Sequence, residues 1–265
     1  MPAQPALRKV ISASRRTDLV AHYPDRLARR IIDLGPESIH TVVIWTKDVG
    51  NILDHGALRE ALASVGQVFV HWTITGLGGA FLEPSVPPAE QQLGLAERLV
   101  AFVGDPRRVH WRYDPLISAD RSGEPAGNVS IPLFRSLAGP LAGAGIPVVH
   151  TSFVTLYPKV VRRLAAAGIA PIQPSPEEAT RFLCDLGAAA ADLGMRLITC
   201  CESAFGRQSC IDGGLLTELH PAHEPCRADR ARGQRELCGC TVSLDVGRYL
   251  PCPNRCLYCY AHPAA

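Results

Sequence analysis

Three cysteines late in the chain have a spacing that suits metal chemistry. Cys252, Cys256 and Cys259 follow the pattern C-x3-C-x2-C, and the aromatic residue Tyr258 comes directly before the third. A short loop with this spacing can bring three thiolates to three corners of a cubane [4Fe–4S] cluster. With only three protein ligands, the fourth iron is free to bind another molecule. The spacing therefore predicts an iron–sulfur site with one open coordination position.

The cysteine content of the whole chain points in the same direction. All ten cysteines lie from Cys184 onward in a chain of 265 residues. A secreted disulfide scaffold is usually shorter and distributes its cysteines across the fold. The first residues contain prolines and charges but no apolar run typical of a secretory signal. We therefore expect a cytoplasmic protein whose clustered cysteines bind metal or do redox chemistry.

Composition and charge exclude several other classes of protein. No apolar run approaches the roughly 20 residues needed to cross a bilayer, so we expect no association with a membrane. The net charge of +2 is too small for strong electrostatic binding of nucleic acid. The sequence contains no P-loop, no dinucleotide-binding glycine motif and no nucleophile elbow. With 47% hydrophobic residues, the chain can bury a large core.

The region before the cysteines must supply the elements that position them, and its pattern recurs. Runs rich in β-branched and aromatic residues predict strands at 10–14, 40–46, 68–75, 109–113, 147–153 and 195–200. Segments with apolar residues at helical spacing lie between the strands, for example at 25–34 and 57–65. Stretches rich in Gly and Pro, at 76–88 and 118–127, predict loops. The alternation predicts an α/β fold, a TIM-like parallel barrel that is partial, with about six βα units.

We expect the chain to have two parts. Residues 1–200 would form the barrel, and residues 201–265 would form a cysteine-rich Fe–S extension packed on the barrel mouth. In parallel barrels the functional groups gather at the carboxyl ends of the strands. Polar residues follow the predicted strands here, among them Ser14, Arg15, Arg16, Lys47, Arg112, Asp114 and Glu202. Their convergence on one mouth is the pattern expected of an enzyme or a ligand-binding barrel.

The cysteine triplet resembles the cluster motif of the radical S-adenosylmethionine (radical SAM) superfamily. The ending Tyr258-Cys259-Tyr260-Ala261 is also similar to the cluster loop of the spore photoproduct lyase group. In that superfamily a reduced cluster passes an electron to the sulfonium of SAM, and a 5′-deoxyadenosyl radical forms. The resemblance implies a [4Fe–4S] cluster, SAM and an electron donor of the flavodoxin or ferredoxin type. The motif usually lies near the N-terminus, so its late position here is a departure.

The resemblance also implies roles for individual residues. Main-chain groups around Tyr258 and Tyr260 would lie beside the adenine of SAM. The carboxylate and ribose of SAM need cationic and hydroxyl donors, for which the best strand-end candidates are Ser14, Arg15, Arg16, Lys47 and Arg112. Asp114 and Glu202 are the candidate catalytic residues, which would bind an amino group or transfer a proton in the substrate site. The substrate is unknown, and nucleic acid, peptide and small metabolite all stay open.

Over nearly its full length the chain resembles a bacterial family described as domain of unknown function 1848. The resemblance rests on residues 11–18, 45–47, 111–115, 209–212 and 235–240 together with the terminal triplet. Four cysteines recur in that pattern, namely Cys200, Cys210, Cys238 and Cys240. Cys201 could take the place of Cys200, although the resemblance favours Cys200. Four thiolates suit a second, fully ligated [4Fe–4S] cluster or a tetrahedral zinc ion. The family brings no known reaction with it.

Two other interpretations of the sequence stay open. His262 follows Cys259 by three positions, so the triplet and this histidine could form a closed Cys3His zinc site in a structural or nucleic-acid-binding barrel. A hydrolase barrel could instead bind a divalent metal through oxygen and nitrogen ligands at the strand ends. The candidate ligands for that metal are Asp18, His22, Asp48, His71, Asp114, His150 and Glu202.

Overall fold

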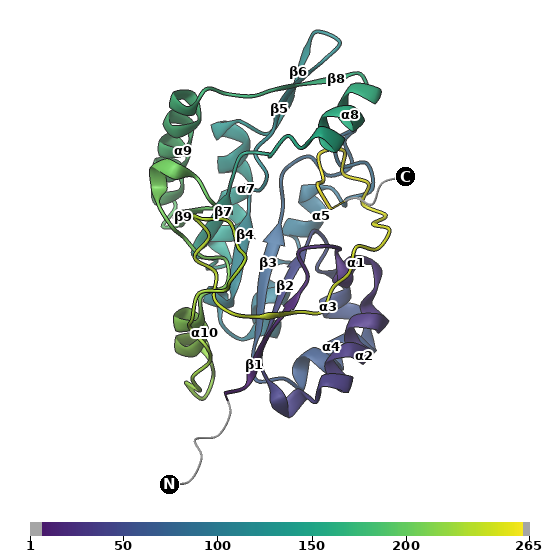
Figure 1. Ribbon diagram of the computed structural model, residues 1–265, viewed down its shortest axis with the longest axis vertical. Helices are drawn as coiled ribbons and strands as arrows, with labels where there is room; N and C mark the ends of the chain where they lie inside the picture. The colour runs from purple at the N-terminus through teal and green to yellow at the C-terminus, as the bar shows by residue number, and fades with distance from the viewer. Residues whose placement is uncertain (1–6, 262–265) are drawn as a thin grey trace.

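Parallel strands run side by side through the centre of the computed structural model, which describes residues 7–261 (Figure 1). The six expected strands are present as β1 (Lys9–Ala13), β2 (Ile39–Thr46), β3 (Val68–Thr73), β4 (Val109–Arg112), β7 (Val148–Thr151) and β9 (Arg196–Thr199). They lie in this order and all pair in parallel. A seventh strand, β10 (Leu244–Asp245), pairs in parallel with β1. The expected α/β fold is confirmed. Within the described residues β9 and β10 are the edges of the sheet and do not pair, so no closed barrel is formed.

Ten helices surround this sheet in the described residues, and most of them pack against one of its faces. They are α1 (Leu19–His22), α2 (Pro24–Leu34), α3 (Gly50–Asp54), α4 (Gly56–Ala63), α5 (Ala89–Leu93), α6 (Ala96–Val103), α7 (Ile131–Gly143), α8 (Pro158–Ala166), α9 (Pro176–Ala191) and α10 (Gly213–Leu219), with short 3-10 turns at Pro36–Ser38, Pro106–Arg108 and Ser203–Phe205. The buried rings of Trp72, Trp111 and Phe134 pack where the sheet meets its helices. No helix in the described part of the chain is long and apolar enough to cross a membrane.

The helix that precedes β9 shows how the local sequence sets an element boundary. Ser175, just before α9, accepts a hydrogen bond from the main-chain N–H of Glu178. The side chain of Glu178 in turn accepts from the N–H of Ser175, which completes a capping box. Pro176 occupies the first helical position, where its missing N–H has no cost. The helix therefore begins at the residue that the sequence predicts.

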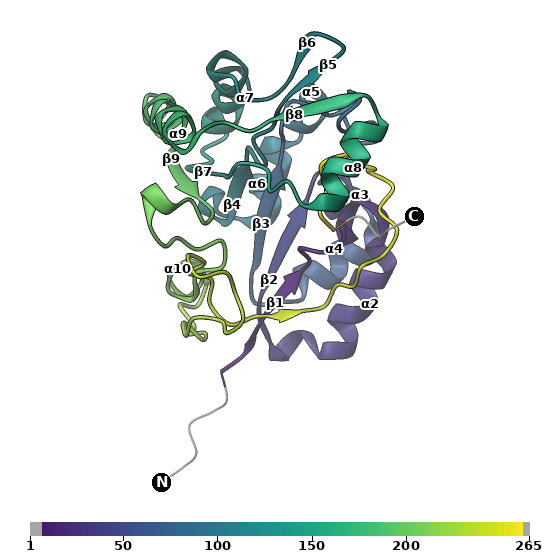
Figure 2. The ribbon, with the colours of Figure 1, turned by 45° about the horizontal axis from the view of Figure 1, so that its top comes forward.

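The opposite face of the sheet, here called the inner face, is covered by the cysteine-rich segment. Val43 and Phe69 lie on this face and pack against residues in and around α10, namely Ile211, Leu216, Leu219, Cys226, Cys238 and Cys240. Figures 1 and 2 show the chain after α10 crossing in front of the strands towards α8. The cysteines are thus part of the wall that closes the inner face.

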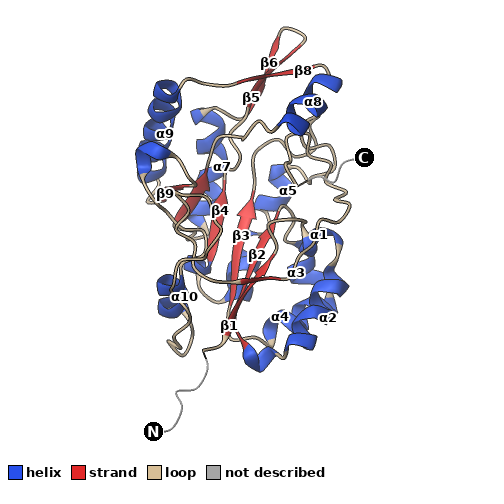
Figure 3. Cartoon of the chain, viewed as in Figure 1, coloured by secondary structure: helices blue, strands red, loops and turns tan. Residues whose placement is uncertain are grey.

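A second, antiparallel sheet corrects one expectation from the sequence. The stretch 118–127 does not form a loop but a hairpin of β5 (Ser118–Arg121) and β6 (Glu124–Gly127), and β8 (Ile169–Ile172) pairs with β5 (Figure 3). Both residues of the hairpin turn, Ser122 and Gly123, have positive φ angles, of 57° and 89°. Type I′ turns require this conformation at both central positions. The prediction failed because the two strands are short, so the residues that favour turns dominate the composition of the whole stretch.

The segment after β10 approaches the end of β1 closely. Thr17 donates a hydrogen bond to the carbonyl of Arg248 at 2.7 Å, and Arg16 donates one to the carbonyl of Gly247 at 3.1 Å. A Cβ atom added to Gly247 would lie 1.9 Å from Oγ of Ser14, a separation that no side chain can keep. Glycine is therefore required at this contact.

Replacing Gly247 by alanine is expected to destabilise the protein by about 1–3 kcal/mol, the usual cost of overpacking a close contact. The free energy of unfolding in chemical denaturant measures the effect. Gly139→Ala in α7 is the matched control, because an added Cβ there meets nothing within 4 Å. It should leave the stability unchanged or raise it slightly. Equal stability of Gly247→Ala and the unmodified protein would contradict the close approach.

Candidate functional site

The terminal cysteine triplet lies near the carboxyl ends of β1 and β2. Cys256 is buried, and Cys252 and Cys259 are partly buried. The three thiols are close enough for the charges of Cys259 and Cys252 to raise the pKa of Cys256. Main-chain groups of Asn254 and Asp18 lie near Cys252 and oppose the effect of burial, which raises the pKa of its thiol. The fold therefore holds the triplet against the chain that follows β1.

A buried ion pair lies next to Cys256. Nζ of Lys47, just after β2, is 2.8 Å from Oε1 of Glu83 and 3.1 Å from the hydroxyl of Tyr258, which also donates to Glu83. Glu83 is 1% exposed and accepts a further hydrogen bond from Thr75 at 2.7 Å. Burial raises the pKa of the Cys256 thiol, and the charge of Lys47 acts in the opposite direction. The site thus places a fixed positive charge beside a buried sulfur.

The second set of cysteines gathers on the inner face. Cys200 follows β9, Cys210 precedes α10, and Cys238 and Cys240 lie before β10. The thiols of Cys200 and Cys210 are neighbours, and their interaction lowers the pKa of the first and raises that of the second. Contacts between Cys210 and Cys240, and between Cys240 and Cys238, continue the chain of sulfur atoms. The fold therefore brings together cysteines from two separate stretches of the sequence, 200–210 and 238–240.

Three arginines direct their guanidinium groups at these sulfur atoms. At N–S distances of 3.3, 3.4 and 3.6 Å, the pairs are Arg235 with Cys200, Arg15 with Cys240 and Arg112 with Cys210. The main-chain N–H of Cys210 also donates to the sulfur of Cys240 at 3.2 Å. Neutral thiols are weak acceptors, whereas anionic or metal-bound sulfur is stabilised by such donors. The arrangement is suited to a negatively charged sulfur centre.

The two candidate catalytic acids have different surroundings. Asp114 forms an ion pair with Arg112 and accepts a hydrogen bond from Ser152 at 2.6 Å. Glu202 accepts from the main-chain N–H of Phe153 at 3.0 Å and lines a cavity of about 250 Å³. The cavity is bounded by residues of the antiparallel sheet, the start of α9 and the segment after β9. Of the two acids, Glu202 is the one placed beside a space that could hold a small ligand.

The residues predicted to bind SAM divide between the two cysteine sites. Lys47 and Tyr258 lie at the terminal triplet, whereas Arg15 and Arg112 lie at the second set. The others contact neighbouring main chain. Oγ of Ser14 accepts from the N–H of Arg16 at 3.1 Å, the side chain of Arg16 binds Gly247, and the hydroxyl of Tyr260 donates to the carbonyl of Arg15 at 3.1 Å.

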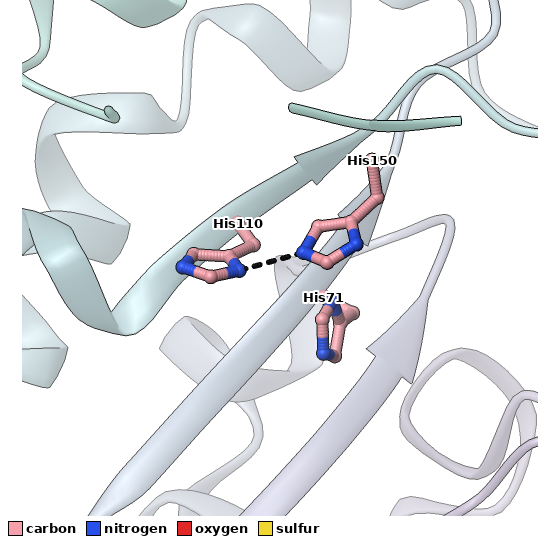
Figure 4. Close-up of side chains that lie close together, drawn as sticks. All are labelled: His71, His110 and His150. Carbon is pink, nitrogen blue, oxygen red and sulfur yellow. Dashed lines mark hydrogen bonds between the residues drawn. The ribbon is translucent and has the colours of Figure 1, made fainter. Parts of the chain in front are cut away.

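The ligands suggested for a hydrolase metal do not converge on one point. Among the described residues, one group of three metal-ligating side chains has ligand atoms within 4.8 Å of one another, and it consists of His71, His110 and His150 (Figure 4). The remaining candidates have separate hydrogen-bonding partners: Asp18, His22, Asp48, Asp114 and Glu202. His262, the fourth ligand of the alternative zinc site, lies outside the described residues.

His110 is absent from the ligands predicted from the sequence, although a signal for it exists. Both β3 and β4 contain the dipeptide His-Trp, as His71-Trp72 and His110-Trp111, and the two strands pair with these residues in register. Alternation along a strand sends the tryptophans into the helix-covered core and the histidines to the inner face. The repeated dipeptide on neighbouring strands thus predicts a histidine layer.

Fold and site together define a parallel α/β protein whose inner face and strand ends carry two groups of cysteines. Residues 28–261 match the family described as a domain of unknown function (DUF1848), and the chain belongs to this family. The resemblance to that family seen in the sequence is thus confirmed. A search of curated proteins finds no match to the chain. The family description gives no reaction, so the function has to be inferred from the site.

Proposed function

We propose that this protein is an iron–sulfur enzyme of the radical SAM type. Cys252, Cys256 and Cys259 would hold a [4Fe–4S] cluster with one open iron, and the second cysteine set would hold another cluster. The observation that carries the proposal is the environment of the sulfur atoms. Buried cysteines at two places face fixed cations and N–H donors, among them Lys47 near Cys256 and Arg15 at Cys240. Such donors stabilise the negative charge of ligated clusters and tune their potential.

The spacing of the cysteines favours a cluster over zinc. Tetrahedral zinc with Zn–S bonds of about 2.3 Å requires sulfur atoms about 3.8 Å apart. Among the described residues, no three cysteines have sulfur atoms that all lie within 4.8 Å of one another. A cubane distributes its ligands over separate iron atoms and needs a wider arrangement. The short separation of Cys238 and Cys240 also departs from the C-x2–4-C spacing of zinc ribbons.

The parallel sheet supports the same proposal. Its main strands follow one another in chain order, which is the topology of a barrel, and we infer that it is a partial barrel left open between β9 and β10. Functional groups at the carboxyl ends of such strands meet at one mouth. The triplet lies beside Asp18 and Lys47, which follow β1 and β2, and Glu202 follows β9.

Several residues of the chain would have separate roles in this reaction. When bound, a reduced cluster would supply the single electron that cleaves the carbon–sulfur bond of the SAM sulfonium. Lys47 would balance negative charge at Cys256, and Glu202 would bind an amino group or move a proton in the cavity beside it. The electron would come from a flavodoxin- or ferredoxin-type donor, and the second cysteine set would relay it or anchor the substrate.

Anaerobic purification followed by iron, sulfide and zinc analysis tests this function. We expect a brown protein with about seven to eight irons that releases 5′-deoxyadenosine from SAM after chemical reduction. About three to four irons together with SAM cleavage would limit the proposal to the terminal cluster. A colourless protein with one or two zinc ions and no SAM cleavage would overturn it.

A further inference from the structure

Three buried histidines form a layer that the iron–sulfur chemistry does not use. His71 lies in β3, His110 in β4 and His150 in β7, which are consecutive strands of the sheet. Their exposed fractions are 0%, 3% and 0%. Figure 4 shows the rings gathered at one point, and their centroids are separated by 5.0 to 5.7 Å. The layer lies directly beneath the second cysteine set, because His71 contacts the main chain of Cys210.

The hydrogen bonds within this layer are incomplete. Nε2 of His71 is 2.7 Å from the carbonyl oxygen of Cys210, so it donates its hydrogen there. Nδ1 of the same ring is buried and has no hydrogen-bonding partner. Nδ1 of His110 and Nε2 of His150 are 2.8 Å apart and share a single hydrogen. Buried polar atoms are nearly always paired, so the free nitrogen of His71 calls for a ligand.

The charge state of the layer suits a metal ion. All three rings are buried, and burial disfavours the charged imidazolium form. Neutral imidazole is the form that coordinates metal. Arg15, Arg112 and Arg196 lie around the layer, and Arg112 is balanced by its ion pair with Asp114. The sulfur of Cys210 lies 4.0 Å from Nδ1 of His150.

We propose that His71, His110 and His150 bind a divalent transition-metal ion of the zinc type. Zinc at 2.0–2.1 Å from each nitrogen separates the ligand nitrogens by about 3.3 Å. One nitrogen of each ring already lies within 4.8 Å of the other two, so movements of the rings can bring them to that separation. The carbonyl of Cys210 fixes the tautomer of His71 and orients its Nδ1, as carbonyls commonly do behind metal-bound imidazoles.

The same geometry defines which ion fits and what it does. A set of imidazoles without a carboxylate favours zinc-like ions and disfavours magnesium and calcium. Because all three rings are buried, the ion has no access for a substrate, and its role is structural. It ties β3, β4 and β7 together beneath the cysteines. The three proposed ligands are all histidines and include none of the cysteines of the two cluster sites. The proposal therefore does not rest on the iron–sulfur function.

Zinc binding by matched glutamine variants tests the site. In His71→Gln the amide can still donate to the carbonyl of Cys210, but the free ring nitrogen is lost. His40→Gln is the control, because His40 is also buried and its Nε2 lies 2.7 Å from the carbonyl of Glu224. After treatment with a chelator and dialysis against excess zinc, we expect the unmodified protein and His40→Gln to hold one more zinc than His71→Gln. Equal zinc content in all three proteins would overturn the site.

A second measurement keeps the proposal testable if His71→Gln does not fold. X-ray absorption at the zinc edge is recorded on the unmodified, anaerobically purified protein with one equivalent of zinc. A first shell with about three imidazole nitrogens at 2.0–2.1 Å supports the site, and a shell of sulfur alone overturns it. Iron is measured in the same samples. Absence of iron would contradict the iron–sulfur function without changing the comparison between the variants.

Discussion

Replacing Cys256 by alanine is expected to abolish release of 5′-deoxyadenosine from SAM and to remove about four irons. Cys256 is the most deeply buried member of the triplet and lies against Lys47 and Glu83, so no neighbouring side chain can take its place. The parallel strands should persist, because the triplet lies outside them. Iron analysis, chromatography of the nucleoside product and far-UV circular dichroism measure the three effects.

Cys184→Ala is the matched control for this substitution. Cys184 is an exposed cysteine on α9 and belongs to neither cysteine group. Its variant should keep the iron content and the cleavage of SAM. A Cys256→Ala protein that still produces 5′-deoxyadenosine at the unmodified rate would refute the assignment of the triplet.

Replacing Cys238 and Cys240 together by serine is expected to remove the second cluster, again about four irons, while the terminal cluster stays. Arg15 and the N–H of Cys210 both donate to the sulfur of Cys240, so its loss removes the ligand of the set with the most hydrogen-bond donors. Iron content and the electron paramagnetic resonance of the reduced protein measure the change, because one of two cluster signals should disappear.

Cys226→Ser provides the comparison for the double variant. Cys226 is buried in the same hydrophobic cluster as Cys238 and Cys240, but its thiol donates to the carbonyl of Gly213 at 3.4 Å. A serine there can make the same hydrogen bond, so iron content should not change. If the double variant kept its full iron, the second cluster would be excluded.

The scaffold could be predicted from the sequence because its signals are local. The β-branched runs at 40–46 and 68–75 became β2 and β3, and Ser175 with Glu178 set the start of α9. The hairpin at 118–127 was missed for a local reason as well. Its strands are short. The turn needs residues that tolerate positive φ angles, here Ser122 and Gly123, and such residues are also typical of irregular loops.

The details of the site could not be predicted because they depend on long-range packing. Arg15 and Arg112 carry the same charge at strand ends, and nothing in their neighbourhood in the sequence distinguishes a SAM ligand from a partner of sulfur. Both meet cysteines more than 90 positions away, at Cys240 and Cys210. Only the path of the chain across the inner face decides which role the geometry favours.

The pairing of β10 with β1 has a consequence for the solubility of the protein. β10 occupies an edge that would otherwise present unpaired N–H and C=O groups to other chains. The cysteine-rich segment that precedes β10 covers Val43 and Phe69 on the inner face. Damage that releases the cysteine-rich segment, such as oxidation of its thiols, would uncover a strand edge and an apolar surface at the same time. We therefore expect aggregation to accompany the loss of metal, so that damaged molecules are withdrawn from solution.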